Sequence, residues 1–357
     1  MRHFQATPSR FLLGSLALLA ATGCGDSTSP GEPEDPGTQL VPIGYLGAGP
    51  VWTRDGTELL YILRTTINQK EAALLRAVNP STRSVRELGA FPRIGRLVGS
   101  TGGERIYFGN FISPPSAAGN YQISRLHPTL GQQEIVATVD ASTDNDAGLA
   151  VSGDERFLAV GRHLYDLQTG TRIDLPTGTP IEFSPDGSQL LYYSTTLSPT
   201  TSSPTLISTA DGSAKPLHST TGDALSLYGG HRWQGNSPQL VGTAHNDAFT
   251  SVRVFEIDGV TGATQDIAQF RGYALFTPAT WSPDGNVLAI WIATGAPSDA
   301  PAREILYLIR PGNVPAAVGN VAGVPGQPVF SPSGNSIAYF IRYGDLQQGA
   351  LFLKSGL

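Results

Sequence analysis

Residues 183–192 read FSPDGSQLLY, and this phrase decides the fold because it recurs along the chain. It returns as WSPDGNVLAI at residues 281–290 and as FSPSGNSIAY at residues 330–339. WTRDGTELLY at residues 52–61 is a more divergent copy. A repeat of this kind is the signature of an array of supersecondary units, each packed on its neighbours.

Each copy predicts two antiparallel strands joined by a tight turn. Proline presets φ for the turn, aspartate accepts hydrogen bonds from the backbone that follows it, and glycine adopts positive φ. The apolar residues after the turn are typical of a strand. One copy is therefore half of a four-stranded blade. The repeated aspartates are interpreted as turn residues, with cation ligands or catalytic acids as the alternative.

The number of copies predicts the number of blades. The apolar residues that open them are Trp52, Val98, Val151, Phe183, Trp233, Trp281 and Phe330. Most intervals are close to the roughly 40 to 50 residues of a four-stranded propeller blade. The interval that starts at Val151 is shorter, but it accommodates three more strands if their turns are very tight. Without it one blade would be nearly twice as long as its neighbours, so seven blades are favoured over six.

A strand-like run precedes the first copy, and the last blade lacks a fourth strand. Residues 39–46 read QLVPIGYL, and pairing them with residues 351–354 would close the ring and remove two free sheet edges. Val41, Ile43 and Tyr45 alternate along this run, so we expect them on one face.

Composition agrees with this architecture. The 42 glycines and 27 prolines, with no long helical periodicity, leave little room for a helical domain. The predicted fold class is all-β: a seven-bladed, or alternatively six-bladed, β-propeller over residues 39–357, with an N-terminal strand closing the last blade.

The first residues have the pattern of a signal peptide. Arg2 and Arg10 precede an uncharged run that ends at Cys24. The run is shorter than the roughly 20 apolar residues of a membrane-spanning helix. We expect a signal peptide over residues 1–23. Residues 24–38 are rich in Pro, Gly, Ser and acids and are expected to form a disordered tether.

The end of the signal resembles the bacterial lipobox. In Ala21-Thr22-Gly23-Cys24 small residues precede the cysteine, as in lipoproteins whose cysteine is lipidated, although Ala21 stands where Leu is usual. Cys24 is the only cysteine, so internal disulfides are excluded. An incidental cysteine beside an ordinary cleavage site is the alternative. The resemblance implies a cell-envelope lipoprotein. Where the host has two membranes, lipoproteins with Asp directly after the cysteine tend to stay at the inner membrane. Gly25 occupies that position here, so the outer membrane, facing the periplasm, is favoured.

The charge balance argues against nucleic acid as a partner. The net charge is −6, and losing Arg2 and Arg10 with the signal peptide makes it −8. No basic stripe remains to neutralise phosphates.

The Ser-Pro-Asp-Gly copies resemble the WD40-like repeats of TolB-type propellers, of prolyl oligopeptidase relatives and of many bacterial lipoproteins. The match spans about residues 40–357 and implies the fold. We see neither the α/β domain of TolB proteins nor the Gly-x-Ser-x-Gly elbow of the peptidases. A monomeric, non-catalytic binding or scaffolding propeller without a cofactor is expected, with a protein, peptide or glycan as partner. The alternative is an envelope polysaccharide lyase or hydrolase.

Topology indicates where a site would lie. Loops between second and third strands and loops between blades open on one face, opposite the Pro-Asp-Gly turns, and imidazole and carboxylate groups there could bind a metal or act as acid and base. The candidates are His218, Asp223, Tyr228, His231, Arg232, His245, Asp247 and Tyr273. Scattered surface histidines are the alternative.

Two further expectations concern charged groups. Asp140, Asp144 and Asp146 share one predicted loop and could offer oxygen ligands to a hard cation, although a solvated acidic loop is the alternative. Glu182 and Arg232 precede the opening residues of neighbouring blades, so we expect them to form an ion pair near the ring axis.

The lipobox resemblance generates a first prediction. Cys24→Ser should abolish incorporation of labelled fatty acid, because the thiol is the group that would be acylated. Ser27→Ala, a hydroxyl removed from the same segment, should label like the wild type. Continued labelling of the Cys24→Ser chain would exclude the lipoprotein assignment.

Overall fold

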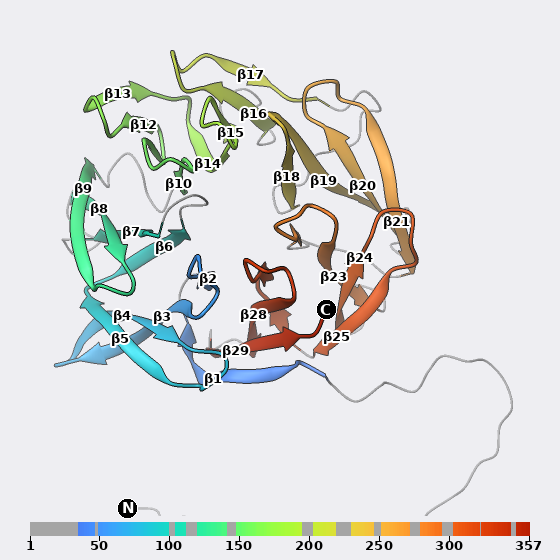
Figure 1. Ribbon diagram of the computed structural model, residues 1–357, viewed down its shortest axis with the longest axis horizontal. Coiled ribbons are helices and arrows are strands. Elements are labelled where there is room, and N and C mark those ends of the chain that lie inside the picture. Colours follow the sequence, from blue (N-terminus) through green and yellow to red (C-terminus); the bar gives the residue numbers. More distant parts are fainter. Residues whose placement is uncertain are drawn as a thin grey trace, which may run out of the picture. The chain divides into compact units, whose positions relative to one another are not determined.

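The computed structural model describes most of the chain after residue 34. The described residues are 35–46, 49–99, 104–111, 120–140, 148–194, 203–218, 230–245, 251–271, 279–294, 303–321, 323–343 and 348–357. They form an all-β ring of seven blades (Figure 1), which confirms the predicted propeller and excludes six blades. None of the described residues belongs to a helix long and apolar enough to cross a membrane.

The first three blades each run outward from the ring axis, strand by strand (Figure 1). Blade 1 contains β2 (Val51–Trp52), β3 (Leu59–Ile67), β4 (Lys70–Val78) and β5 (Val85–Phe91). Blade 2 contains β6 (Ile94–Gly99), β7 (Ile106–Phe111), β8 (Asn120–His127) and β9 (Gln132–Asp140). Blade 3 contains β10 (Leu149–Val151), β11 (Phe157–Val160), β12 (His163–Asp166) and β13 (Thr171–Asp174).

The next three blades repeat this antiparallel order. Blade 4 contains β14 (Gly178–Phe183), β15 (Gln189–Ser194), β16 (Ser203–Ser208) and β17 (Ala214–Pro216). Blade 5 contains β18 (His231–Gln234), β19 (Ser237–His245), β20 (Ser251–Asp258) and β21 (Thr264–Arg271). Blade 6 contains β22 (Ala279–Trp281), β23 (Leu288–Thr294), β24 (Arg303–Ile309) and β25 (Ala316–Val321).

Blade 7 is assembled from both ends of the described chain. Its inner strand is split into β26 (Val324–Pro325) and β27 (Val329–Phe330), followed by β28 (Ser336–Tyr343) and β29 (Gln348–Ser355). Its outer strand is β1 (Thr38–Leu46), which pairs antiparallel with β29. The predicted closure of the last blade is therefore confirmed.

Hydrogen bonds explain the repeated turn. The Ser184 hydroxyl donates to Asp186 Oδ1 at 2.7 Å and accepts from the backbone N–H of Gln189 at 3.0 Å, while Asp186 Oδ1 also accepts from Ser188 N at 3.0 Å. The Ser184 hydroxyl and the backbone N–H of Ser188 lower the pKa of Asp186 to about 2. The same Ser/Thr-to-Asp bond recurs at Thr53–Asp55 and at Ser152–Asp154. These aspartates shape the hairpins, as the turn interpretation predicts.

Blade 3 departs from the repeat at Glu155, which occupies the turn position that Gly187 has in blade 4. Its φ is 58°, in the left-handed region that usually favours glycine. Glu155 Oε2 accepts from Arg105 Nη1 and from the Tyr107 hydroxyl of blade 2, both at 3.0 Å. These bonds join two blades and account for a non-glycine residue in this conformation.

The core lies between the blades. Seven clusters of buried apolar side chains, among the described residues, each join two successive blades. Between blades 6 and 7, for example, Trp291 packs edge-on against Tyr339 with ring centroids 5.0 Å apart. Since each blade buries its faces only against its neighbours, stability depends on a complete ring.

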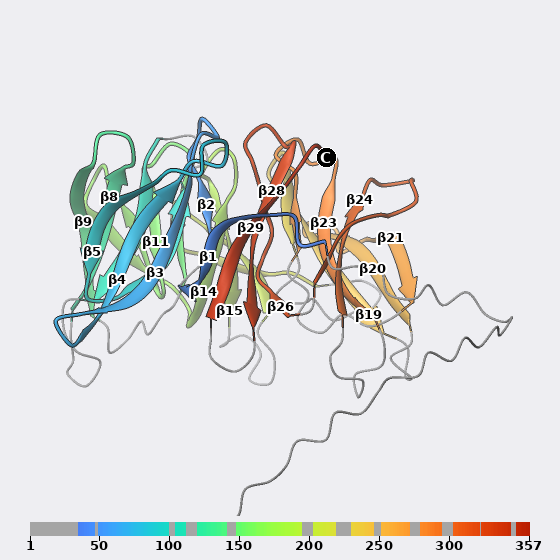
Figure 2. The same cartoon turned by 90° about the horizontal axis from the view of Figure 1, so that it is seen from below.

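The segment 35–46 fastens three blades together. Asp35 exchanges backbone hydrogen bonds with Asn320 of blade 6 and forms an ion pair with Lys354 of blade 7. β1 then follows β29 and ends beside β3 of blade 1, where Leu46 pairs with Leu63. Figure 2 shows β1 crossing from β29 toward β3. Gly37 is required on this path, because a Cβ atom there would lie 2.5 Å from the Leu353 carbonyl oxygen.

The expected alternation of Val41, Ile43 and Tyr45 is wrong. Register shifts interrupt the pairing of β1 with β29 on both sides of Val41. As a result, the successive residues Leu40 and Val41 are both buried. A bulge adds a residue to one strand, so side chains on its two sides no longer alternate between the faces of the sheet in one continuous pattern.

Val41 provides a test of the closure. It lies in the apolar cluster that joins β1, blade 1 and blade 7, so Val41→Ala should lower the free energy of unfolding by about 2 kcal/mol through lost burial and an unfilled cavity. Val85→Ala is the matched control, because Val85 is 47% exposed on the outer strand of blade 1. Denaturant unfolding that gives equal stability changes for both variants would contradict the closure role.

Candidate functional site

Most of the predicted ligand-face residues cannot be placed. Asp223, Tyr228, Asp247, Tyr273, Asp144 and Asp146 lie outside the described residues. Asp140 and His245 end β9 and β19, but their side chains are not described. His218 is exposed after β17. Only His231 and Arg232 are described within one strand, so the predicted cluster stays a prediction.

Within the described part of the chain, no group of three or more His, Cys, Asp or Glu side chains is arranged to hold a metal ion. The predicted metal site depends largely on residues beyond that part, so it also stays a prediction.

His231 and Arg232 point in different directions. His231 Nε2 lies 2.6 Å from Glu182 Oε2 of blade 4. Arg232 faces the other way, toward the neighbouring strands and blade 6: its Nε and Nη2 bind Glu256 at 2.8 and 2.9 Å, and its guanidinium lies 4.2 Å from the Trp281 ring centroid. Successive strand residues project to opposite faces, and this alternation separates the two side chains.

The expected ion pair between Glu182 and Arg232 is therefore wrong. Equivalent positions on successive blades point the same way around the ring, so Glu182 faces blade 5 and Arg232 faces blade 6. The partners of Glu182 are the two residues that flank Arg232. Trp233 Nε1 donates to Glu182 Oε2 at 3.2 Å, beside the contact from His231.

A bulge accompanies the placement of Glu182. The register of β14 with β15 shifts between Pro180 and Glu182. Such bulges re-aim side chains and are frequent next to functional sites. With His231 and Trp233 bound to one oxygen, the carboxylate of Glu182 is held in a fixed orientation. Its side chain remains 36% exposed, so it is accessible as well as oriented.

Arg96 lies on β6, the inner strand of blade 2. The register of β6 with β7 also shifts, between Ile94 and Leu97, so Arg96 lies in a second inner-strand bulge. Arg96 is exposed, and among the described residues it has no hydrogen-bond or ion-pair partner. Blade 3 lies between blades 2 and 4, and the charge of Glu182 nevertheless acts on Arg96. We call Arg96, Glu182, His231 and Trp233 the axial cluster.

The electrostatic environment of Arg96 fits this position. Desolvation by the surrounding protein lowers the pKa of its guanidinium, and the negative charge of Glu182 acts in the opposite direction.

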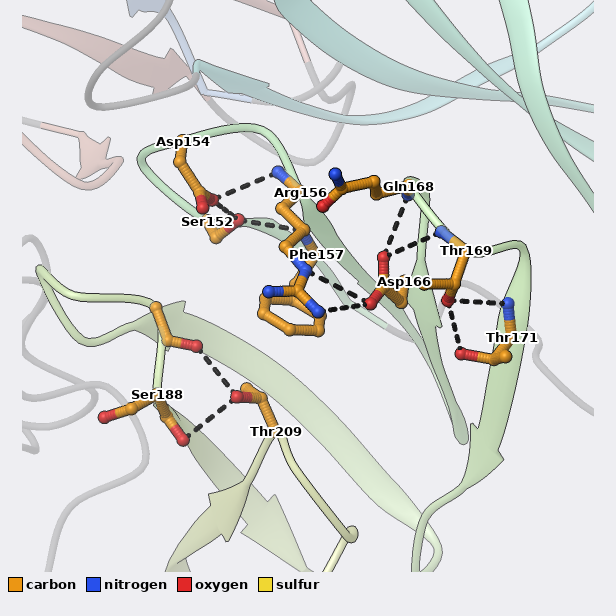
Figure 3. A network of polar contacts seen from close by, with 11 residues as sticks. Ser152, Asp154, Arg156, Phe157, Asp166, Gln168, Thr169, Thr171, Ser188 and Thr209 are labelled. Carbon is orange, nitrogen blue, oxygen red and sulfur yellow. Dashed lines mark hydrogen bonds and ion pairs between the residues drawn. The ribbon is translucent and has the colours of Figure 1, made fainter.

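A recess lies between blades 3 and 4 on the turn face, with a volume of about 370 Å³. Figure 3 shows the polar contacts around it. Arg156 donates to Asp166 Oδ2 through Nε at 3.1 Å and Nη2 at 2.7 Å, and Gln168 N donates to Asp166 Oδ1 at 2.9 Å. Arg156 above all lowers the pKa of Asp166 to about 2. This carboxylate is therefore ionised at neutral pH, and its hydrogen bonds stabilise the tight turn of blade 3.

Glu304 is a perturbed group that the sequence does not reveal. It is partly buried at the start of β24, and desolvation raises the pKa of its carboxyl to about 7. Its sequence neighbours are ordinary strand residues, so only its surroundings in the fold produce the shift.

The comparisons with known proteins show the fold. No protein-family model matches the chain, and no curated protein matches it. An oligogalacturonate lyase from Vibrio parahaemolyticus is similar with a TM-score of 0.64 at 12% identity, over 89% of this chain and 92% of that one. An oligogalacturonate lyase in complex with manganese is similar with a TM-score of 0.63 at 14% identity, over 89% of this chain and 92% of that one. TolB from Acinetobacter baumannii has a TM-score of 0.44 at 13% identity, over 88% of this chain and 64% of that one. The chain is thus a seven-bladed propeller with distant likeness to these proteins.

The corrected position of Arg232 generates a stability prediction. Arg232→Met should lower the free energy of unfolding by about 2 to 3 kcal/mol, because it strands Glu256, whose side chain is only 11% exposed. Arg253→Met removes a similar cross-strand pair and a similar aromatic contact, but with an Asp266 that is 65% exposed. That control should cost about 1 kcal/mol or less. Equal losses in denaturant unfolding would contradict the assignment.

Proposed function

We propose that this chain is a non-catalytic binding or scaffolding propeller, held to a membrane of the cell envelope by a lipid on Cys24. The observation that carries the proposal is the axial cluster, where Glu182 is oriented by two donors and Arg96 has no partner among the described residues. A carboxylate that is held in one orientation and is still partly exposed is available to a ligand. The partner is a protein, a peptide or a glycan that reaches the ring from the envelope space.

The repeated turns support a division between the two faces. Their aspartates accept bonds from their own hairpins, as Asp186 does from Ser184 and Ser188. Carboxylates engaged in this way maintain the blades. The binding groups are therefore sought at the axis and on the opposite face.

The location is proposed from the sequence. The lipobox-like Ala21–Cys24 and the acidic, Pro- and Gly-rich segment that follows would place the propeller on a tether at the outer membrane, facing the periplasm. A monomer fits this arrangement, because the lipid supplies the attachment.

One observation favours an enzyme as the second candidate. An imidazole 2.6 Å from a carboxylate, as in His231 and Glu182, is an arrangement that can serve general acid–base catalysis. The propeller fold hosts both binding proteins and enzymes. In this second candidate the chain is a polysaccharide lyase or hydrolase.

An assay of binding and turnover separates the two candidates. The full chain, purified in detergent, is incubated with envelope polysaccharides and peptides, with and without added Mn²⁺. We expect a retained ligand that is recovered unchanged. New reducing ends or unsaturated products that disappear in His231→Gln would instead establish the enzyme.

A further inference from the structure

The turn aspartate of blade 3 differs from its counterparts in one hydrogen bond. In blades 1, 4 and 6 the residue two positions after the aspartate donates from its side chain to Oδ2 of the carboxylate at 2.9 to 3.0 Å, as Thr57 does to Asp55, Ser188 to Asp186 and Asn286 to Asp284. Blade 3 has Arg156 at this place, and its guanidinium binds Asp166 instead. Among the described residues, Oδ2 of Asp154 therefore has no hydrogen-bond partner.

Asp154 lines the recess between blades 3 and 4. The volume of the recess, about 370 Å³, is in the range of ligand pockets, about 300 to 1,000 Å³. A Cβ atom added to Gly187 of blade 4 would lie 3.9 Å from Asp154 Oδ1 and 3.9 Å from the Phe157 ring, so the two blades meet closely here. Figure 3 shows Asp154 on the hairpin of blade 3, and Ser188 and Thr209 on blade 4.

The lining of the recess matches a long cationic side chain. Three aspartates line it, and Arg156 is the one basic residue among the described lining residues, so their formal net charge is −2. Phe157, Leu164 and Ile173 provide apolar surface beside these charges. The Arg156 guanidinium lies 4.7 Å from the Phe157 ring centroid, which shows that a cation can rest on this surface. A side chain with an apolar stem and a charged end satisfies both parts of the lining.

We propose that the recess binds a lysine side chain of a partner protein, with its ammonium on Asp154 Oδ2 and its methylene stem against Phe157 and Ile173. This second site goes beyond the proposed function, because it lies on the turn face. Asp154 is the exception to the division between the faces, since one of its oxygens is not used by its own hairpin.

The open oxygen favours an ammonium over a guanidinium. Oδ1 of Asp154 already accepts from the Ser152 hydroxyl at 2.6 Å and from the backbone N–H of Arg156 at 3.1 Å. A guanidinium binds a carboxylate best through two parallel bonds to both oxygens, whereas a compact ammonium needs only one of them.

The other two carboxylates favour a lysine over a free diamine. Both oxygens of Asp166 and both oxygens of Asp186 already accept hydrogen bonds. A diamine would bring a second ammonium, for which the recess has no open carboxylate oxygen among its described residues. The single ammonium of a lysine uses the oxygen that is open.

Four capped amino acids test the inference: lysine, norleucine, arginine and 2,3-diaminopropionate, each as its Nα-acetyl N-methylamide. Binding to the full chain in detergent is measured by ligand-observed NMR. The capped lysine should bind most tightly. Norleucine lacks the ammonium, diaminopropionate lacks most of the stem, and arginine would need both oxygens of Asp154 for its two parallel bonds.

Asp154→Asn should weaken binding of the capped lysine about tenfold or more, because it removes a charge-assisted hydrogen bond. Its amide oxygen still accepts from Ser152 and from the backbone N–H of Arg156, so the turn should be retained. Asp284→Asn is the matched control. It changes the charge equally at the equivalent turn of blade 6, where both oxygens of Asp284 already accept hydrogen bonds. It should bind the capped lysine like the wild type, and both variants should melt close to the wild-type temperature.

Equal weakening by the two variants would overturn the proposal, as would equal binding of the capped lysine and the capped norleucine to the wild type. Tighter binding of 1,5-diaminopentane than of the capped lysine would indicate a site for free amines and overturn the assignment to a protein partner. The probe series on the wild-type chain decides the question even if a variant fails to fold.

Discussion

The pairing of β1 with β29 is the constraint on which the rest of the structure depends. No blade buries both faces alone, because every apolar cluster among the described residues joins two successive blades. The ring is therefore stable only if the last blade and the first are joined. Asp35, β1 and Leu46 make this connection, since they contact blades 6, 7 and 1 in turn. Residues distant in the sequence thus complete one sheet.

The closed ring gives the axial cluster its geometry. Arg96 and Glu182 belong to inner strands separated by a whole blade, so only the ring fixes their positions relative to each other. The two bulges redirect these residues without interrupting the blades. The repeated turns form the opposite end of the hairpins, where Asp186 and its counterparts are committed to the backbone. In this account the repeated turns contribute to stability, whereas the proposed binding groups of the axial cluster lie on the inner strands of the same repeats.

The sequence predicts the repeat architecture well and the side-chain partners poorly. Turn chemistry and spacing are local, so seven blades and the closing strand follow from the printed residues. The partner of Glu182 depends on which neighbouring blade each inner-strand side chain faces. Glu182 faces blade 5, where it meets His231 and Trp233 and not the expected Arg232. The position of Arg96 depends on a bulge in β6, and the residue types of Ile94–Gly99 do not predict that bulge.

Native-state hydrogen exchange tests the central claim, closure by β1, most directly. If β1 closes the ring, the backbone amides that join β1 to β29 should exchange only through global unfolding, with the same free energy of opening as the amides between β28 and β29. Exchange of the β1 amides with a free energy near zero, while β28 remains protected, would show a frayed strand. It would contradict the account of a ring fastened by its N-terminal segment.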